Sequence, residues 1–298
     1  MERWCSILFK VPIYGIRNSQ YATGLCMEKI ALTREKETLL ITLYAKARES
    51  LLPESILKDR HAAAAVGRIN YDFSRLRMRR DEMIGLALRA HTLDGWAREF
   101  IAAHPEATVL HLGCGLDTRV QRVDPPPGID WYEVDYPEVI ALRRSLYPAR
   151  PGCTLVGSPV TDPEWLARIP AGRPTLVVAE GLFLYLAEDA LLQLLRTVTA
   201  KFPSGEVVFD SYNRLGLTWV AHNRMIRSTG AVTRWSLRSP QALEGQVPGL
   251  RLRTERGGYE SDDSRQRARY SWPAQAALWL MRRVRPLGGM TQLLRYHY

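Results

Sequence analysis

Apolar positions follow two different periods along the chain, and the period changes near residue 107. After Met27 they recur every three or four residues, which is typical of amphipathic helices. Leu39, Leu40 and Leu43 begin one such helix, a second covers about 61–66, and a longer one covers about 84–103. The first part of the chain is therefore predicted to be helical.

Beyond residue 107, short apolar runs alternate with helical stretches. The predicted strands are 107–112, 130–135, 153–156, 175–179 and 206–210. The stretches between them that favour helices are 137–146, 163–169 and 188–201. Later segments are less regular: 217–225 and 279–283 favour helices, and 250–253 and 293–298 favour edge strands. This alternation predicts an α/β fold whose mostly parallel sheet carries helices on both faces.

Right-handed crossovers bring the carboxyl ends of parallel strands to one edge of the sheet, where ligands bind at the topological switch point. The first strand ends at such a position in Gly113-Cys114-Gly115, and Asp135 ends the second strand, with Glu133 two residues before it. Glycines allow a tight turn and a close approach of a cofactor, and an acid about 20 residues later can accept both ribose hydroxyls. The alternative is a plain turn, with Asp135 capping the helix that starts near Pro137.

The dinucleotide fingerprint requires a third glycine, and Thr118 stands in its place. This argues against NAD and for a nucleoside cofactor without a pyrophosphate, such as S-adenosylmethionine (SAM). The fourth strand is followed by Glu180 and Gly181, flanked by apolar residues. We expect this carboxylate near the cationic part of the cofactor, since buried carboxylates need partners; a surface position is the alternative.

Several motifs in a fixed order resemble the leucine carboxyl methyltransferase superfamily, in its bacterial branch akin to polyketide O-methyltransferases. They are ETLL at 37–40, LGCGLDTR at 112–119, WYEVDYPEV at 131–139, TDPEW at 161–165, AEGLFLYL at 179–186, VFD at 208–210 and TGA at 229–231, with Trp235 and Ser239-Pro240. The resemblance spans about 27–253. It implies a class I, Rossmann-like methyltransferase fold with a seven-stranded, mostly parallel sheet and an N-terminal helical cap.

The resemblance also implies a set of cofactor residues. Arg89 matches an arginine that binds the SAM carboxylate, and Lys36 is a second candidate for that role. The loop after the third strand would face adenine through Ser158 and Val160, because Pro159 stands where many relatives have an acid. The full set is Lys36, Arg89, Gly113, Cys114, Gly115, Glu133, Asp135, Ser158, Val160, Glu180 and Gly181.

Methyl transfer from a sulfonium is an in-line displacement in which proximity and alignment do most of the work. A carboxylate acceptor needs no base, whereas a phenol or an alcohol must lose a proton. Tyr185 and His222 are the catalytic candidates, with Asp210 as a further base. An exposed position is the alternative for His222, and core packing is the alternative for Tyr185. Trp219, Trp235 and Phe183 are candidates for lining an acceptor pocket, with core packing again the alternative.

Composition narrows the class of protein. The 298 residues are 46% hydrophobic and 24% charged, as in ordinary globular proteins, and no apolar run approaches the roughly 18 residues of a membrane span. The formal charge of +10 favours encounters with acidic partners, and arginines gather at 75–80 and 251–295. We interpret both clusters as solvated basic surface and expect neither a nucleic acid nor a membrane as partner.

Four cysteines, Cys5, Cys26, Cys114 and Cys153, form no CxxC pair and no zinc-site spacing. No metal is expected, and a reducing, cytoplasmic location fits best. We divide the chain into an extension at 1–26, a helical cap at 27–104, and a SAM-binding core at 105–298 with an acceptor-site insertion at about 213–245. The role of the extension and the choice between monomer and homodimer stay open.

The predicted function is transfer of a methyl group from SAM to a hydroxyl or carboxyl oxygen of a small, polyketide-like acceptor, which leaves S-adenosylhomocysteine. One alternative is methylation of a protein's C-terminal carboxylate. Others are a nicotinamide-dependent oxidoreductase and a catalytically silent SAM-binding protein. A base-methylating enzyme is rejected because such enzymes usually carry Asn or Asp, two prolines and an aromatic after the fourth strand to receive a flipped base, whereas this site reads Glu180-Gly-Leu-Phe183.

Overall fold

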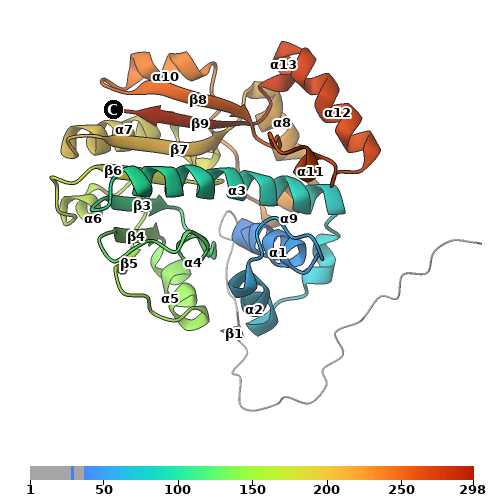
Figure 1. Cartoon of the computed structure of the whole chain (residues 1–298), viewed down its shortest axis with the longest axis horizontal. Coiled ribbons are helices and arrows are strands. Elements are labelled where there is room, and N and C mark those ends of the chain that lie inside the picture. The colour runs from blue at the N-terminus through green and yellow to red at the C-terminus, as the bar shows by residue number, and fades with distance from the viewer. Residues whose placement is uncertain (1–27, 30–36) are drawn as a thin grey trace, which may run out of the picture.

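The computed structural model describes residues 28–29 and 37–298, and Figure 1 shows how its elements are arranged. Seven strands form the central sheet in the order β5-β4-β3-β6-β7-β9-β8. Their bounds are β3 Thr108–Leu112, β4 Asp130–Asp135, β5 Cys153–Gly157, β6 Thr175–Ala179, β7 Gly205–Ser211, β8 Arg251–Gly257 and β9 Gln292–His297. All seven predicted strands are present to within a few residues, and β8 lies at an edge of the sheet as expected. Strand β9, which the sequence favoured as an edge strand, instead lies between β7 and β8, with five of its six residues buried.

The sheet is parallel except for one strand. The pairs β3–β4, β4–β5, β3–β6 and β6–β7 are parallel, whereas β9 runs antiparallel to both β7 and β8. Strand order reverses between β3 and β6, because the chain extends the sheet first toward β5 and then toward β8. This is the switch point at which an open α/β sheet binds its ligand. The mostly parallel sheet agrees with the predicted fold class.

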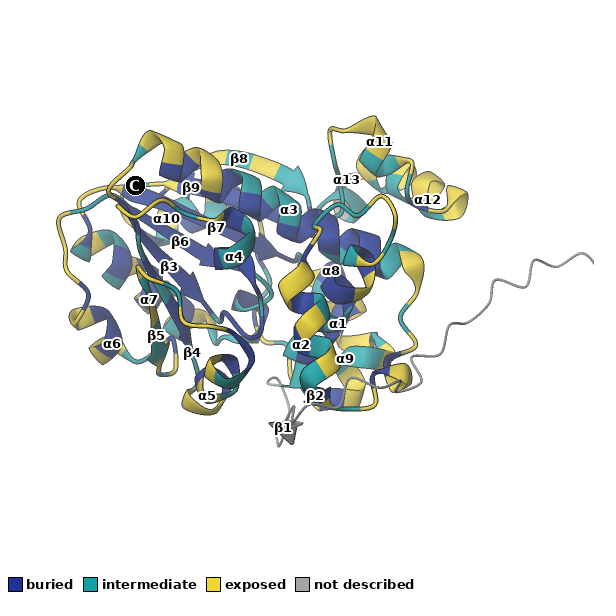
Figure 2. Ribbon diagram, turned by 60° about the horizontal axis from the view of Figure 1, so that its bottom comes forward, coloured by how far each residue is buried: buried dark blue, intermediate teal, exposed yellow. Residues whose placement is uncertain are grey.

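Alternate side chains of each strand enter two cores on opposite faces of the sheet. On β3, Val109 joins a core with helix α3 (Arg80–Ala103) and helix α4 (Arg119–Val123). Its neighbour Leu110 joins the core on the other face, formed with helices α6 (Pro163–Ala167), α7 (Glu188–Lys201) and α10 (Pro240–Gln246). Figure 2 shows the strands buried between these two layers. The predicted coverage of both faces is confirmed.

Local signals start the helices where the sequence indicates. Asp162 accepts a hydrogen bond from the Glu164 N–H at 2.9 Å, and Pro163 occupies the first turn of α6. Helix α5 (Pro137–Leu146) begins in the same way with a proline. Helix α3 starts with the Glu82 carboxylate accepting the Arg79 N–H at 2.7 Å. Helices α5 and α6 follow the carboxyl ends of β4 and β5, whereas α3 precedes the first strand of the sheet.

The helices that precede the sheet form a separate hydrophobic cluster. It is built by α1 (Thr38–Ser50), α2 (Arg60–Arg68) and the 3₁₀ turn η2 (Phe73–Leu76), and it reaches Leu116 and Leu146 of the core. Strands β1 (Glu28–Lys29) and β2 (Ile69–Asn70) make a short parallel pair. These elements fall within 27–104, but the division into cap and core stays a prediction.

Two groups of short helices follow β7 and β8. After β7 the chain forms α8 (Arg214–His222) and α9 (Arg224–Thr229). The turn η3 (Phe183–Tyr185) lies earlier in the chain, before α7. Between β8 and β9 the chain forms α11 (Ser264–Arg267), α12 (Trp272–Arg283) and α13 (Arg285–Gly288). The helix predicted at 217–225 is thus two shorter helices, and the one at 279–283 begins earlier. Among the described residues, no helix is long and apolar enough to cross a bilayer.

Candidate active site

A large cavity opens at the carboxyl ends of β3, β4, β6 and β7, beside the switch point. Its volume is about 1190 Å³. A pocket for one small ligand typically has about 300–1,000 Å³, so this cavity has room for two molecules side by side. One part is lined by strand ends and charged groups, and the other by apolar helices. We call these the floor and the roof of the cavity.

The floor begins at the turn that follows β3. Gly113 and Gly115 both have positive φ angles, 58° and 49°, which favour glycine. A side chain on Gly113 would also collide with Leu182, and one on Gly115 would press on Leu39. Cys114 between them is buried, and burial raises the pKa of its thiol well above the ordinary value. The turn therefore exposes backbone to the cavity and carries no reactive thiolate.

Asp135 lies beside this turn and holds it in place. Its carboxylate accepts the Gly115 N–H and the Tyr136 N–H, each at 2.7 Å. The cap residue of α5 is Tyr136, and no side chain caps this helix. Asp135 therefore does not cap α5, which was the alternative role considered for it. Each carboxylate oxygen keeps a free lone pair, so Asp135 can still accept hydroxyl hydrogens from a ligand. Burial raises its pKa above the usual value.

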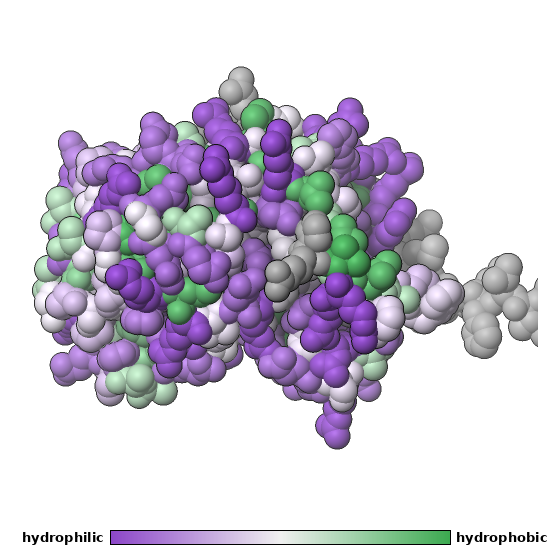
Figure 3. Space-filling model, turned by 90° about the horizontal axis from the view of Figure 1, so that it is seen from above, coloured by the Kyte–Doolittle hydropathy of each residue, from purple (hydrophilic) through white to green (hydrophobic). Residues whose placement is uncertain are grey.

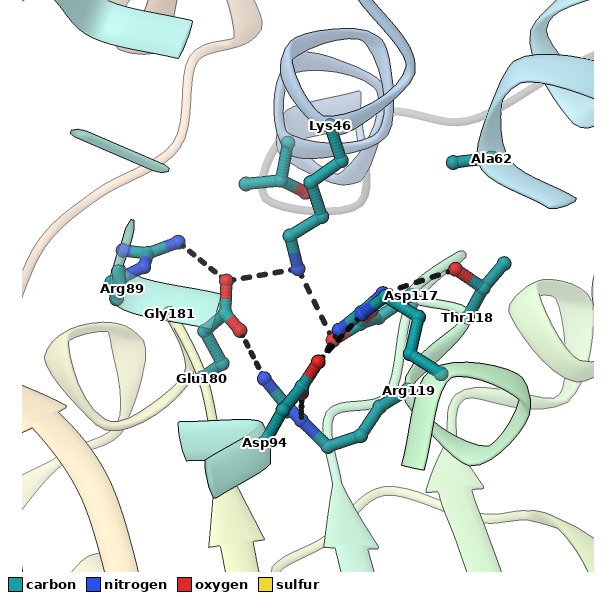
Figure 4. A network of polar contacts seen from close by, with 12 residues as sticks. Lys46, Ala62, Arg89, Asp94, Asp117, Thr118, Arg119, Glu180 and Gly181 are labelled. Atoms are coloured by element: carbon teal, nitrogen blue, oxygen red, sulfur yellow. Dashed lines mark hydrogen bonds and ion pairs between the residues drawn. The ribbon is translucent and has the colours of Figure 1, made fainter. Parts of the chain in front are cut away.

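Glu180, at the end of β6, is the meeting point of three cations. Its Oε1 lies 3.0 Å from Lys46 Nζ and 3.1 Å from an Arg89 amino nitrogen, and its Oε2 lies 2.5 Å from Arg119. Figure 4 shows these groups converging from α1, α3 and α4. Burial alone would raise the pKa of Glu180, but the three cations outweigh it and hold the pKa far below the usual range. Glu180 is therefore ionised and fully partnered.

The same network continues behind the glycine turn. Arg119 pairs with Asp94 at 2.7 Å, and Arg122 bridges Asp94, Asp59 and Asp117 at 2.7–2.8 Å. Thr118, which replaces the third glycine of a dinucleotide site, is buried and donates its hydroxyl to Asp59. Its side chain thus belongs to the charged network and does not line the cavity.

A count of this network leaves one carboxylate in excess. In the described part of the chain, its cations are Lys46, Arg89, Arg119 and Arg122, and its carboxylates are Asp59, Asp94, Asp117, Glu180 and Asp210. His111 lies against it, and burial lowers the pKa of its imidazole, so it adds no charge at neutral pH. The floor therefore favours a positively charged ligand.

Arg89 joins the floor to the end of β7. It donates to Asp210 at 3.0 Å and to the Tyr212 hydroxyl at 3.3 Å, while Asp210 also accepts the Gly181 N–H at 2.5 Å. Arg89 is buried and lines the cavity, but its Nε hydrogen has no partner among the described residues. A buried donor left without a partner in a cavity wall suits a ligand with an acceptor oxygen.

The roof is made by the two groups of short helices. From α8, α9 and the loop after them come Trp219, Val220, Met225, Ile226, Val232 and Arg234. From the segment between β8 and β9 come Tyr259, Tyr270, Ala274, Ala277, Leu278, Met281, Leu287 and Met290. Tyr185, Leu184 and Tyr212 connect roof and floor. This lining can enclose an apolar molecule next to the charged floor.

Most of the candidates from the sequence line the cavity, namely Arg89, Gly113, Cys114, Gly115, Asp135, Glu180, Gly181, Tyr185 and Trp219. Lys36 lies outside the described residues. Glu133 does not line the cavity: its carboxylate is buried and pairs with Arg143, which outweighs burial and lowers its pKa. We therefore leave Glu133 out of the proposed site.

Five further candidates lie away from the lining. His222 is exposed on α8, with Nδ1 2.8 Å from the Thr218 carbonyl oxygen. Val160 is buried in the core, and Ser158 contacts Pro159 and Asp162, so Thr161 is the residue of that loop that lines the cavity. Trp235 and Phe183 belong to the core as well, which was the alternative for both.

Sequence reasoning missed several cavity residues. Lys46 lies on α1 and reaches Glu180 across the cavity floor, and Asp117 and Arg119 come from the motif whose glycines drew attention. Tyr259 and Tyr270 come from the segment after β8, which looked irregular in sequence. Lys46 carries no local signal in the sequence, because its partner Glu180 is 134 positions away.

Comparison with known proteins agrees with this geometry. The family model for leucine carboxyl methyltransferase matches residues 40–199, more than half of the chain. The tetracenomycin polyketide synthesis O-methyltransferase TcmP of Streptomyces glaucescens is 44% identical over 228 residues, which cover 76% of this chain and 84% of that protein. The S-adenosyl-L-methionine-dependent methyltransferase dpfgK of Gibberella zeae is 35% identical over 76% of this chain and 83% of its own.

Solved structures show the same fold at low sequence identity. A protein of the DUF574 family from Streptomyces avermitilis superposes with a TM-score of 0.56 at 14% identity, covering 89% of this chain and 97% of that one. A Thermobifida fusca protein named as a methyltransferase superposes with a TM-score of 0.52 at 18% identity, covering 85% and 93%. The chain therefore belongs to the leucine carboxyl methyltransferase family, and the predicted class of enzyme, an S-adenosylmethionine-dependent methyltransferase, is confirmed.

Proposed function

We propose that this protein transfers a methyl group from SAM, bound on the floor of the cavity, to an oxygen of a small apolar acceptor held under the roof. The observation that carries the proposal is the continuity of the two compartments in one cavity of about 1190 Å³. A donor site and an acceptor site that share a wall bring the reacting atoms together, which is the main requirement of an in-line transfer.

The residues of the floor fit SAM. Gly113 and Gly115 bring the backbone to the wall of the cavity, and Asp135 has free lone pairs for two ribose hydroxyls. Arg89 offers an unused Nε hydrogen to a carboxylate. The excess negative charge of the network around Glu180 suits a sulfonium, which when bound supplies an activated methyl group. Thr118 stands in place of the third glycine of a dinucleotide site, which argues against the nicotinamide alternative.

The acceptor oxygen must reach the junction of floor and roof, where Tyr185, Tyr212 and Tyr259 line the cavity. Burial raises the pKa of the Tyr212 and Tyr259 hydroxyls, so both stay protonated and can orient an oxygen by hydrogen bonding. Asp210 is tied to Arg89 and to Gly181, which weakens its case as a base. We propose Tyr185 as an orienting residue and withdraw His222, whose ring lies on the exposed side of α8.

Two observations favour a small molecule over a protein's C-terminus. The acceptor compartment extends beneath α8, α9 and α12, and the lining of the cavity is mostly apolar. The most similar relatives named above include an O-methyltransferase of polyketide synthesis, which supports an aromatic or polyketide-like acceptor for this chain.

The four cysteines of the sequence include no CxxC pair, which supports a reducing, cytoplasmic setting.

Calorimetric titration with SAM and with S-adenosylhomocysteine, and with NADH as the control, tests the donor site. We expect binding of the two SAM-type ligands and none of NADH. A folded sample that binds neither would refute the proposal and favour a protein that has lost the methyltransferase reaction. If SAM binds, screening of aromatic hydroxy acids, phenols and short peptides ending in a free carboxylate would then separate the two acceptor classes.

A further inference from the structure

Helix α12 faces two environments. Its residues Ala274, Ala277, Leu278 and Met281, spaced as one face of a helix, line the roof of the cavity. The opposite face carries Trp272, Trp279 and Arg283, at the spacing of successive turns. The side chain surfaces of Trp272 and Trp279 are 79% and 56% exposed, which is unusual for the largest apolar side chains.

The exposed face of α12 extends into an apolar and basic patch. Leu280 and Val284 are exposed beside the tryptophans, and the guanidinium of Arg283 stacks 3.7 Å above the ring centre of Trp279. We call these five residues the α12 patch. Figure 3 shows hydrophobic side chains gathered on this end of the molecule, next to the arginines. None of the residues of α12 is buried, and the helix projects from the body in Figure 2.

The segment that carries the patch is basic, but acidic groups lie beside it: Glu260 pairs with Arg282, and Asp81 accepts hydrogen bonds from Ser271 at the start of α12. From Ser264 to the C-terminus the sequence contains seven arginines and neither an aspartate nor a glutamate. The charge of Arg282 is balanced by an ion pair with Glu260 at 3.2 Å. Arg283 instead stacks on the ring of Trp279 and has no acidic partner among the described residues. The patch therefore complements a surface that is negatively charged and offers an apolar layer beneath its charges.

We propose that the α12 patch docks on an anionic lipid bilayer, with the tryptophans at the level of the head groups and the arginines on the phosphates. Tryptophan prefers this interface, and exposed helices that combine aromatic residues with arginine lie in its plane. The proposal revises the expectation of no membrane partner, which rested on the lack of a spanning segment; a surface helix needs no span.

Docking would place the roof of the cavity against the bilayer, since the two faces of α12 are a helix diameter apart. An apolar acceptor dissolved in the membrane would then meet the acceptor compartment directly. This second step rests on the proposed function. Docking itself does not rest on the proposed function. It is measured without cofactor or acceptor, so a failure of docking can be told apart from a failure of the proposed function.

The test is co-sedimentation of the full chain with vesicles of mixed phosphatidylcholine and phosphatidylglycerol, compared with vesicles of phosphatidylcholine alone. We expect binding to the anionic vesicles that weakens in high salt. The variant W272S/W279S should lower the partition coefficient by about tenfold or more, and W272F/W279F should retain most of the binding. Circular dichroism checks that each variant is folded.

A matched pair of variants separates the patch from the general basic charge. Arg283→Gln should lower binding to anionic vesicles about fivefold, the effect of one cation at a membrane surface. Arg168→Gln removes the same charge from an exposed site on the α6 end of the molecule and should change binding much less. Equal loss in both would overturn the proposal in favour of nonspecific attraction.

Two further outcomes also contradict the proposal. One is the absence of binding to anionic vesicles by the folded protein. The other is self-association in light scattering that W272S/W279S abolishes, together with a lack of vesicle binding. That result would assign the patch to a second copy of the chain.

Discussion

The floor and the roof of the cavity are built on opposite principles. On the floor, side chains from α1, α3, α4 and the ends of β3, β4, β6 and β7 make ion pairs of 2.5–3.3 Å that leave little freedom of position. On the roof, short helices contribute mostly alanine, leucine, methionine and aromatic side chains, and α12 has no buried residue. The proposed donor site is thus fixed in position, and it faces a proposed acceptor site that can adapt.

This difference matches what each half must recognise. A single cofactor requires the same polar groups in the same places, and buried charged networks are strongly destabilised when one member is removed. An apolar acceptor is held by surface area, and flexible side chains such as methionine can adapt to its shape. We therefore expect substitutions on the floor to act on stability and donor binding, and substitutions on the roof to act on the acceptor alone.

The largest effect should come from the centre of the network. Arg119→Met removes one of the cations that pair with the buried carboxylates of Asp94 and Glu180, and should lower the free energy of unfolding by about 3–5 kcal/mol. Urea unfolding measures it. Arg168→Met, at an exposed position, is the control. If both variants lose the same small amount, the network does not stabilise the floor.

Asp135→Asn should weaken SAM binding by about tenfold to a hundredfold, because it removes a charged acceptor beside the glycine turn. Asn keeps one oxygen for the Gly115 N–H but turns an amide donor toward the Tyr136 N–H, so the melting temperature should fall modestly, and the titration is run well below it. Asp130→Asn, at the exposed start of the same strand, is the matched control in the calorimetric titration. Unchanged affinity in the Asp135 variant would remove this residue from the donor site.

Trp219→Ala tests the roof. The ring lines the cavity while half of its surface is exposed, so its loss should raise KM for the acceptor about three- to tenfold. The dissociation constant for SAM should stay the same. Leu215→Ala lies on the same helix, is equally exposed and does not line the cavity, and it should leave both values unchanged. A change in SAM affinity in the Trp219 variant would mean that floor and roof are not separate.

A smaller effect should appear in the pH dependence of donor binding. Burial raises the pKa of Asp135, so its carboxylate takes up a proton at a higher pH than an ordinary aspartate does. SAM affinity should therefore fall as the pH is lowered through this raised pKa and recover above it. Calorimetry across the acidic range measures the change, and Asp135→Asn should flatten it. Glu180 should not contribute, since its pKa lies far below the usual range.

Sequence patterns were informative where the chemistry is local. The glycine turn requires positive φ angles at two neighbouring positions, and Asp135 ends a strand that is adjacent in the sheet, so spacing alone located both. Arg89 followed from a family resemblance. Glu133 shares the alternation of its strand with Asp135, but it points into the pair with Arg143, and only the structure separates the two acids.

The sequence by itself determined the sheet, its switch point and the donor turn, because apolar periodicity and glycine conformation act over a few residues. Only the tertiary structure decided that Lys46 meets Glu180, that Asp117 and Arg119 close the floor, and that residues 259–291 complete the roof. Those contacts join positions far apart in the chain, and ion pairs between distant helices and strands leave no periodic signal. The physical reason is that a buried charge depends on whatever partner the fold brings to it.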